Sequence, residues 1–554
     1  MKLMKYFLTG LLGASLLLSR GACTSDAGSG AESASESTAP VSTDAVSDAV
    51  KKPYTAGTFP KDATEVRYSD FGAVGDGVTD DQKAIRLAHN IANARNLPVK
   101  ADEGKTYYIN AAESTKTIEI ETDTDWTGAS FIIDDTNVLA KAAQRAHHVF
   151  EVAPSKEAYN ITDITQAVKG QTEFDVAPDG DAMLIFTDET SIQYIREGNN
   201  ANSGSAKSDT TILRADKTVR PGTELVWDFQ HITSIRAIPL EEETLIIRGG
   251  VFTTKAKKQD STSYYNRGIH VIRSGVVLDG ITHYVTGEGK NSAPYYGFLN
   301  ITECADITVK NCVFTARKQY SPGTYDIKMT RALNVTFENC TQSNDILDTD
   351  YWGIMICHRT KQLTVKNCSF NRVDAHSGFF NVSIIGSELG HQGINAIGGG
   401  TLLIEDSTVY GKHFINLRSD YGAVWDGDLI VRNSTWVPNK GKDLTGAYAF
   451  IGGSYSGFHN FGYACGMPRN ITLENLHVDD SRATDKYTGI RLLGNIVEDW
   501  TNAEYEKKVG AEGYPYSVPE TVTISGFSSA SGKNWTLTKN TYMYRTVKVT
   551  DLDK

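Results

Sequence analysis

Residues 363–421 concentrate side chains that can move protons and bind carboxylates. An imidazole accepts a proton near neutral pH, a guanidinium neutralises a carboxylate, and a phenol can donate a proton to a leaving group. A merely solvated surface tends to carry Lys, Glu, Ser and Thr instead. The candidate catalytic residues are Arg372, Asp374, His376, His391, Asn395, Asn416, Arg418 and Tyr421.

β-Elimination within a uronic acid polysaccharide would give these side chains separate tasks. The uronate carboxylate must be neutralised, the proton on the adjacent carbon removed, and the departing glycosidic oxygen protonated. The expected roles are neutralisation by Arg418, Asn395 and Asn416, proton abstraction by His376 or His391, proton donation by Tyr421 or Tyr351, and orientation of an imidazole by Asp374.

Two other classes of function remain open on the same residues. Glycoside hydrolysis needs two carboxyl groups about 5 to 9.5 Å apart. A glycan-binding surface protein needs stacking and hydrogen bonds but no proton-transfer groups, so the clustered histidines and arginines argue against it. The carboxylates that keep hydrolysis open are Asp345, Asp348, Asp350, Asp374 and Asp420.

A repeated pattern of short β-branched runs and polar corners surrounds these candidates. Asn311, Asn339 and Asn367 follow such runs at equal spacing, and a cysteine comes directly after each. Repeats of roughly 20 to 50 residues with strand periodicity predict a stacked parallel β-helix, in which the cysteines are buried thiols rather than disulfides. In the three candidate-bearing coils, the expected corner pairs are Asn367-Cys368, Ile385-Gly386 and Asp406-Ser407.

Strand alternation predicts which side chains leave the core. Apolar residues such as Val373 and Ala375 must point inward, so Arg372, Asp374 and His376 point outward on one face. Successive rungs about 4.8 Å apart would gather the candidates within a patch on the order of 15 Å across. Upstream coils extend this face through Asp326 and Asp350, and the substrate-binding candidates are Tyr351, Lys328, Asp420, Gln392 and Tyr296.

Residues 70–81 read DFGAVGDGVTDD and precede a helical pattern. Thr79 and Gln82 predict a capping box, and the apolar face comprises Ala84, Ile85, Ala88, Ile91 and Ala92. At these residues the chain resembles the pectin-lyase-like right-handed parallel β-helix superfamily. The resemblance implies this fold, with an N-terminal capping helix, over residues 68–478 and a habit of acting on carbohydrates. It does not fix the reaction, because one fold hosts many activities.

A second, shorter resemblance concerns the RVDAH, GHQGIN and FINLRSDYG segments. They look like the secreted β-helix polysaccharide lyases of gut bacteria that act on glycosaminoglycans such as chondroitin and hyaluronan. The polygalacturonase pattern is matched less well. Asn344-Asp345 lacks the expected Thr, no adjacent Asp pair follows, Gln392 interrupts the Gly-His-Gly, and Leu417-Arg418-Ser419 replaces the basic tripeptide.

The N-terminus predicts export. Residues 1–23 combine Lys2 and Lys5, an apolar run and small residues before Cys23, as in a bacterial lipoprotein signal peptide, although Arg20 departs from the usual pattern. Residues 24–52, rich in Ser, Ala, Asp and Glu, predict a flexible tether. We therefore expect a protein that is periplasmic or lipid-anchored to the bacterial outer membrane or cell surface, with no other membrane contact.

The remaining chain predicts one β-helix domain over residues 60–554. Residues 137–243 lack the repeat and predict an inserted β-rich excursion, in which His147 and His148 are expected at the surface. Residues 481–554 predict a closing segment, and we expect a monomer.

The net charge of −12 argues against nucleic acid as a partner. An acidic polysaccharide substrate therefore needs a local basic patch. Calcium could neutralise a uronate if Asp374 and Asp420 bound it, but the neighbouring guanidiniums favour a site without a cofactor.

Overall fold

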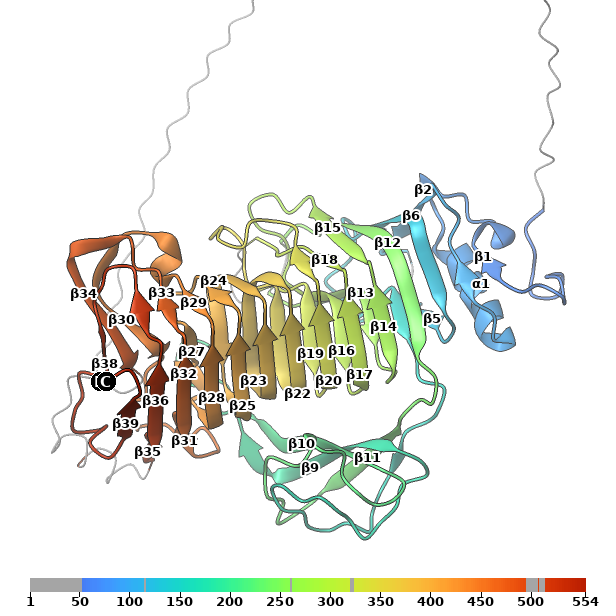
Figure 1. The fold of residues 1–554 in the computed structure, drawn as a ribbon. Coiled ribbons are helices and arrows are strands. Elements are labelled where there is room, and N and C mark those ends of the chain that lie inside the picture. Colours follow the sequence, from blue (N-terminus) through green and yellow to red (C-terminus); the bar gives the residue numbers. More distant parts are fainter. Residues whose placement is uncertain (1–51, 114–115, 260–261, 319–322, 495–506, 508–513) are drawn as a thin grey trace, which may run out of the picture. The chain divides into compact units, whose positions relative to one another are not determined.

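The computed structural model describes residues 52–113, 116–259, 262–318, 323–494, 507 and 514–554. These residues form a right-handed parallel β-helix, in which 33 strands join one continuous sheet (Figure 1). The predicted fold class is confirmed. Cys23 and the expected tether up to residue 51 lie outside the described residues. Within the described part of the chain, no helix has both the length and the apolar character that crossing a bilayer requires.

Each coil contributes to three ladders of parallel strands, which we call A, B and C. Ladder A precedes the corner asparagines, ladder B follows them, and ladder C carries most of the candidate site. Ladder A contains β14 (Val276–Asp279), β17 (Ala305–Lys310), β20 (Leu333–Glu338), β25 (Gly398–Glu405), β28 (Trp425–Arg432), β32 (Asn470–Glu474), β36 (Thr521–Ser525) and β39 (Lys548–Asp551).

The other two ladders follow the same order along the solenoid. Ladder B contains β15 (Thr282–Thr286), β18 (Val313–Phe314), β21 (Thr341–Gln342), β26 (Thr408–Val409), β29 (Thr435–Trp436), β33 (His477–Val478) and β37 (Ser528–Ser529). Ladder C contains β5 (Ile118–Ile120), β7 (Phe150–Val152), β13 (Tyr265–Val271), β16 (Tyr295–Thr302), β19 (Ile327–Thr330), β27 (Ile415–Leu417), β30 (Leu444–Gly452), β34 (Ala483–Leu493) and β38 (Trp535–Thr536).

Some strands are long enough to bend from one ladder into the next. They are β12 (Leu245–Lys255), β22 (Met355–Lys366), β23 (Ser369–Ile385) and β24 (Glu388–Ala396). The first coils are built from β1 (Val66–Arg67), β2 (Asp76–Asp80), β3 (Val99–Lys100), β4 (Thr106–Asn110) and β6 (Thr124–Asp134).

The corner residues adopt a left-handed backbone that favours Asn and Gly. Asn311, Asn339 and Asn367 have φ of 55°, 54° and 52°, and the Asn339 amide donates to Asn311 Oδ1 at 3.4 Å. The predicted asparagine ladder is therefore present. In the following coil Asn367 stacks on Gly386, since Lys366 pairs with Ile385. The expected corner pair Ile385-Gly386 is wrong by one residue, because Gly386 alone supplies the left-handed position.

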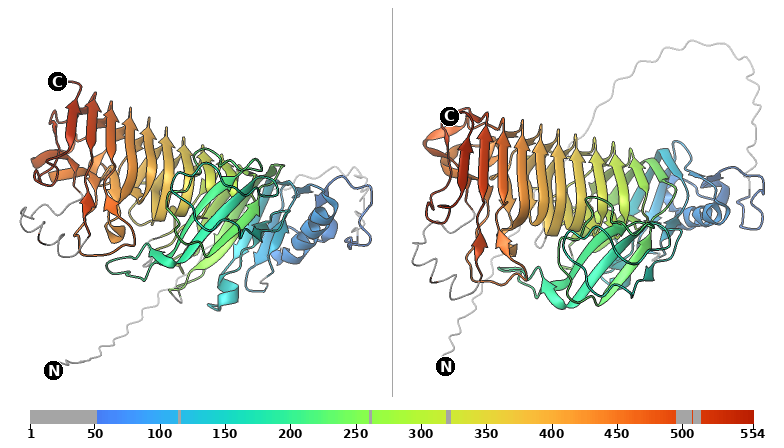
Figure 2. Two further views of the ribbon diagram at one scale, coloured as in Figure 1. Left: turned by 90° about the horizontal axis from the view of Figure 1, so that it is seen from below. Right: turned by 60° about the horizontal axis from the view of Figure 1, so that its bottom comes forward.

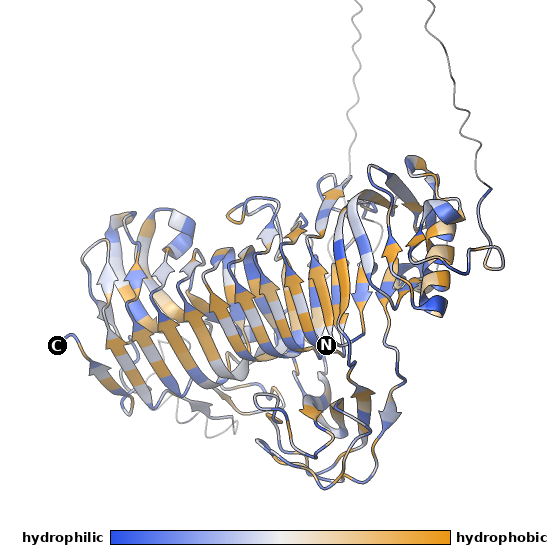
Figure 3. Ribbon diagram, turned by 45° about the vertical axis from the view of Figure 1, so that its right-hand side comes forward, coloured by the Kyte–Doolittle hydropathy of each residue, from blue (hydrophilic) through white to orange (hydrophobic). Residues whose placement is uncertain are grey.

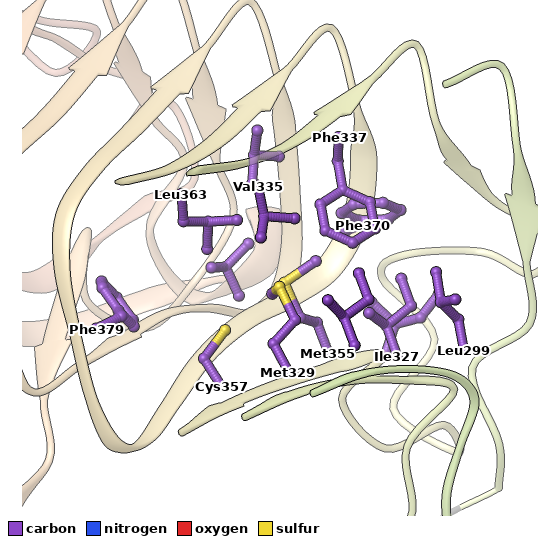
Figure 4. Packing of buried hydrophobic residues seen from close by; sticks show 14 of the residues in the cluster. Leu299, Ile327, Met329, Val335, Phe337, Met355, Cys357, Leu363, Phe370 and Phe379 are labelled. Carbon is purple, nitrogen blue, oxygen red and sulfur yellow. The ribbon is translucent and has the colours of Figure 1, made fainter. Parts of the chain in front are cut away.

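The core lies between the three ladders. Phe337 of ladder A, Phe370 of ladder B and Met355 of ladder C meet there with no exposed surface (Figure 4). Each such side chain stabilises the fold by about 1.5–3 kcal/mol. Hydrophobic and hydrophilic residues alternate along the strands (Figure 3), as a sheet with one buried face requires. The described cysteines are free and buried, as the sequence predicts.

The N-terminal helix α1 (Gln82–Arg95) packs on the first coils with Ile85, Ala88 and Ala92 buried, whereas Ala84 and Ile91 are half-buried. The predicted capping box is wrong. The Thr79 hydroxyl donates to Asp76 at 2.9 Å, and the backbone N–H of Gln82 donates to Asp80 Oδ1 at 3.1 Å. Thr79 lies in β2 and is therefore not available to the helix.

The excursion begins later than residue 137. The short helix α2 (Ala142–Arg145) is followed by β7, which pairs with β5 and β13 and so belongs to the solenoid. The inserted antiparallel sheet has the order β10 (Ser205–Leu213), β9 (Ala182–Gln193), β11 (Ser234–Pro239) and β8 (Tyr159–Asn160). It lies against the side of the solenoid (Figure 2), where Lys361 Nζ and Asp209 Oδ1 form a buried ion pair at 2.7 Å.

The expectation that His147 and His148 lie at the surface is wrong. Both are buried, and the His148 ring stacks on His270 of ladder C with 4.3 Å between centroids.

Towards the C-terminus, the solenoid continues to β39, and β31 (Cys465–Gly466) pairs with β35 (Tyr516–Ser517) beside it. Short 3-10 helices occur at Ser69–Phe71, Ser419–Tyr421 and Pro438–Gly441.

Candidate active site

The strands of ladder C place the outward side chains in register. Asp374, Asn395 and Asn416 are direct partners on three successive rungs, while Val373, Ile394 and Ile415 beside them are buried. The register predicted for this face is confirmed. The amide of Asn416 donates to Asn395 Oδ1 at 2.8 Å, so the two amides form a ladder.

Five charged side chains form a continuous chain of ion pairs, which we call the ion chain. Asp374 Oδ2 lies 2.9 Å from Arg372 Nη2, and Asp374 Oδ1 lies 3.2 Å from Arg418 Nη1. Asp420 Oδ2 then lies 2.7 Å from both Arg418 Nη2 and Arg196 Nη2. Three guanidiniums thus face two carboxylates, and the ion chain carries one excess positive charge.

The ion chain is largely removed from solvent, which strengthens its electrostatic interactions. Asp374 is fully buried, and Arg372 and Arg418 are buried beside it. Although burial opposes its charge, Asp374 and Asp420 raise the pKa of Arg418. Burial by itself would raise the pKa of Asp420, but the hydrogen bonds and charges of Arg418 and Arg196 lower this pKa overall.

His376 and Tyr421 lie beside the ion chain and contact each other. The Tyr421 hydroxyl is 3.4 Å from His376 Nδ1, and the two rings meet edge to face at 5.6 Å. Burial, followed by the charge of Arg418, lowers the pKa of His376 well below its ordinary value. Burial raises the pKa of Tyr421. At neutral pH the imidazole is therefore uncharged and the phenol retains its proton.

Asp374 does not orient an imidazole, contrary to the sequence-based expectation. Its oxygens bind Arg372 and Arg418, and Asp420 is likewise held by guanidiniums. Calcium fits these two carboxylates poorly, because the oxygens it would need are already paired with cations. Asp420 is also poorly suited to be the general acid of a glycoside hydrolase, because its pKa is lowered and that role needs a raised pKa.

His391 of β24 lies apart from His376, which belongs to β23 on the preceding coil. Its Nε2 is 3.1 Å from the carbonyl oxygen of Tyr351, in the loop before β22. Gly393 pairs with Arg372, so His391 and His376 are on the order of 15 Å apart along the strand direction. Burial, and then the charge of Lys440, lowers the pKa of His391 to about 4. The two histidines do not form one cluster.

The remaining predicted substrate contacts are distributed around this face. The carbonyl oxygen of Gln392 accepts from the Asn395 amide at 2.9 Å. Lys328 Nζ lies 4.2 Å from the ring centroid of Tyr296, which stacks on Tyr264 at 3.9 Å. Lys328 and Tyr296 lie on coils upstream of the ion chain, whereas Gln392 lies on the coil that follows Asp374.

Asp326 and Asp350, which were expected to extend this face, lie in other surroundings. Asp326 has no exposed surface and bonds His283 Nδ1 at 2.8 Å inside the solenoid. It precedes β19 and also accepts a hydrogen bond from the Thr315 backbone N–H at 3.1 Å, so its role is structural. Asp350 lies in an exposed turn, where its amide donates to Asp348 at 2.9 Å.

Several site residues were missed from the sequence. His358 of β22 lies 5.3 Å from His376 between ring centroids, and burial with the charge of Lys328 lowers the pKa of His358 to about 3. Alternation could have revealed it, since Met355 and Cys357 are inward residues of the same strand. Arg196 and Tyr194 come from the excursion, where no periodicity marks them.

Comparisons with known proteins give limited overlap. No protein-family model matches the chain. A capsule KL64-specific depolymerase of a Klebsiella phage is 32% identical over 115 residues, which cover 17% of this chain. The chain thus spans only 11% of that relative's length.

The solved structures found by comparison have low sequence identity to this chain. The Gp54 tailspike of Acinetobacter baumannii bacteriophage AP22, in complex with a capsular saccharide, has a TM-score of 0.47 at 11% identity. This match covers 85% of this chain and 77% of the tailspike. The Streptococcus pneumoniae surface adhesin PfbA has a TM-score of 0.40 at 12% identity, covering 82% of this chain and 100% of the adhesin.

Proposed function

We propose that this protein depolymerises a uronic-acid-containing polysaccharide by β-elimination. The observation that carries the proposal is the contact between a neutral imidazole, His376, and a protonated phenol, Tyr421, beside an ion chain with one excess positive charge. Elimination requires a base, an acid and a cationic environment for the uronate, and this site brings all three together.

The cationic environment comes from the arginines of the ion chain. Two of their donors, the buried Arg372 Nε and Arg196 Nε, have no hydrogen-bond partner among the described residues. A uronate carboxylate bound there would balance the excess charge. It would also stabilise the enolate-like charge that develops when the adjacent proton is removed.

The proton transfers follow from the protonation states. His376 takes the proton from the carbon next to the carboxylate, and the electron pair of that bond forms a carbon–carbon double bond. The glycosidic oxygen departs from the neighbouring carbon and receives the proton of Tyr421. A strongly lowered pKa makes His376 a weak base in the free protein, but a bound uronate raises this pKa by placing a negative charge nearby.

The partial similarity to a capsule depolymerase supports action on a polysaccharide. We propose a glycosaminoglycan such as chondroitin or hyaluronan as the substrate class, on the resemblance of the residues around His376 and Arg418 to lyases for those polymers. We further propose that a monomer acts outside the cytoplasm, held to a membrane through Cys23. Cys23→Ala should then move the protein from the membrane fraction to the soluble fraction.

The test is incubation of the purified protein with chondroitin, hyaluronan, polygalacturonate and a neutral polymer such as dextran. Elimination gives an unsaturated uronate, so ultraviolet absorbance should rise together with new reducing ends. Reducing ends without absorbance would establish hydrolysis and overturn the proposal. Binding without any cleavage would instead favour a non-catalytic glycan-binding surface protein.

A further inference from the structure

A cavity of about 460 Å³ lies between the excursion and ladder A. This volume is within the range of small-molecule sites, about 300–1,000 Å³. The cavity is separate from the ion chain and His376, none of which lines it. The ring of Tyr194 lies between the cavity and the ion chain. Its centroid is 6.3 Å from that of Tyr421 on one side and 5.2 Å from that of Tyr463 on the other.

The floor of this cavity is a gap in a row of outward side chains. On successive rungs of ladder A, Phe380 pairs with Gly399, and Gly399 pairs with Asp426. Gly399 has no side chain, and an added Cβ would lie 2.5 Å from the Asp426 carbonyl oxygen. A side chain at this rung would therefore clash with the neighbouring backbone. Phe380 and Asp426 are two rungs, about 10 Å, apart, and the bare backbone of Gly399 lines the cavity between them.

Aromatic rings from three parts of the chain enclose the floor. Trp227 of the excursion lies 6.1 Å from Tyr463, with the ring planes tilted by 30°, and 6.4 Å from Phe380. Both Trp227 and Tyr463 are half-buried, so part of each ring remains accessible. Partly exposed aromatic faces offer stacking surface for the C–H face of a sugar ring.

The charged residues around the cavity are acidic in sum. Lys169 pairs with Asp426 at 2.7 Å, and Arg469 lies 3.8 Å from both Asp426 and Glu520. With Glu224 in the lining, three carboxylates face two cations. This excess of negative charge is opposite to that of the ion chain and disfavours an anionic ligand.

We propose that this cavity binds a neutral pyranose unit. The choice of a sugar as ligand rests on the proposed function, whereas the cavity and its charge do not. Trp227 and Tyr463 supply the stacking faces, and the carboxylates at the rim accept hydrogen bonds from sugar hydroxyls. The protein then holds a uronate at the ion chain and a neutral sugar on the other side of Tyr194.

Binding of methyl glycosides of glucose, galactose, N-acetylglucosamine and N-acetylgalactosamine to the full-length protein tests this site. Titration calorimetry should show saturable binding of at least one of them. Trp227→Ala should weaken that binding by at least about tenfold. Ala464→Trp should block it by filling the cavity from an exposed lining position, without removing a core side chain. Tyr284→Ala, at an exposed aromatic residue on β15, serves as the matched control and should change nothing.

Each contrary outcome overturns the assignment. No binding of any neutral glycoside, or unchanged binding to both cavity variants, excludes the site. Stronger binding of methyl galacturonoside, lost in Ala464→Trp, would contradict the charge argument. His376→Ala should keep neutral-sugar binding while it removes elimination, so failure of the proposed reaction and failure of this site are distinguishable.

Discussion

His376 and His391 lie on neighbouring coils of the candidate site and both have a lowered pKa, but the groups around them differ. His376 contacts the Tyr421 side chain and lies beside the ion chain. His391 contacts the backbone carbonyl of Tyr351 and lies near Lys440. Both imidazoles are unprotonated at neutral pH, so protonation state alone does not distinguish a base from a structural residue. The difference is that only His376 has an acid and several guanidiniums within reach.

The largest effect should come from His376→Ala. Loss of a general base costs about 10²–10⁴ in rate, so kcat for elimination should fall at least a hundredfold. His231→Ala, at an exposed histidine of the excursion, is the matched control and should retain full activity. Nearly unchanged activity in His376→Ala with an intact circular dichroism spectrum would show that His376 is not the base.

Tyr421→Phe should have the next largest effect. The variant keeps the ring that packs near Arg196 and Arg418 but removes the proton donor. Loss of about tenfold to a hundredfold in kcat is expected, because water can partly replace the phenol. The loss should shrink for substrates with a better leaving group, which need less protonation. An equal loss for all leaving groups would argue for a structural role.

Arg196→Ala should act mainly on substrate binding. It leaves Arg372 and Arg418 facing Asp374 and Asp420, so the excess positive charge of the ion chain disappears. We expect KM to rise by about tenfold with a smaller change in kcat, a loss of about 1.4 kcal/mol. Arg196→Lys should recover part of the difference. A change confined to kcat would contradict this role.

His391→Gln should change kcat by less than about threefold, because Gln can still donate to the Tyr351 carbonyl oxygen. Comparison of His391→Gln with His376→Ala is the sharpest internal control, because the two histidines lie on neighbouring coils. A loss as large as that of His376→Ala would show that the two histidines act together.

The smallest effect expected is that of pH on kcat/KM between about pH 5 and 8. This ratio reports ionisations of the free enzyme. A histidine with its ordinary pKa near 6.5 would lose activity as the pH falls through that value, because its charged form cannot accept a proton. The pKa of His376 is lowered, so the loss should occur only at more acidic pH. A fall centred near pH 6.5 would contradict the buried environment of His376.

Much of this fold follows from local rules. Alternation of apolar residues places Asp374, Asn395 and Asn416 on one row, and left-handed corners require Asn or Gly, so both could be predicted. The corner pair Ile385-Gly386 was placed one residue too early, because Gly386 occupies the corner that asparagine marks in the preceding coils. The capping box failed because Thr79 is used by a strand, and tertiary context overrides such local signals.

The site was predicted only in part, for a different physical reason. Periodicity fixes the face on which a side chain lies but not its partner, so the pairing of Asp374 with Arg418 was not foreseen. Arg196 reaches Asp420 from the excursion, at a sequence separation that no local pattern encodes. The position of His391 was misjudged because a bulge between Phe370 and Arg372 shifts the register there.

The most direct test of the central claim is the mass of the cleavage products formed by the wild-type protein and by His376→Ala. Elimination consumes no water, so each new non-reducing end should be lighter by one water molecule than the corresponding hydrolysis product. We predict that the wild-type protein gives only such unsaturated ends from a uronate polymer, and that His376→Ala gives none at matched protein concentration. Saturated ends from the wild-type protein, or unsaturated ends formed at an equal rate by His376→Ala, would contradict the account.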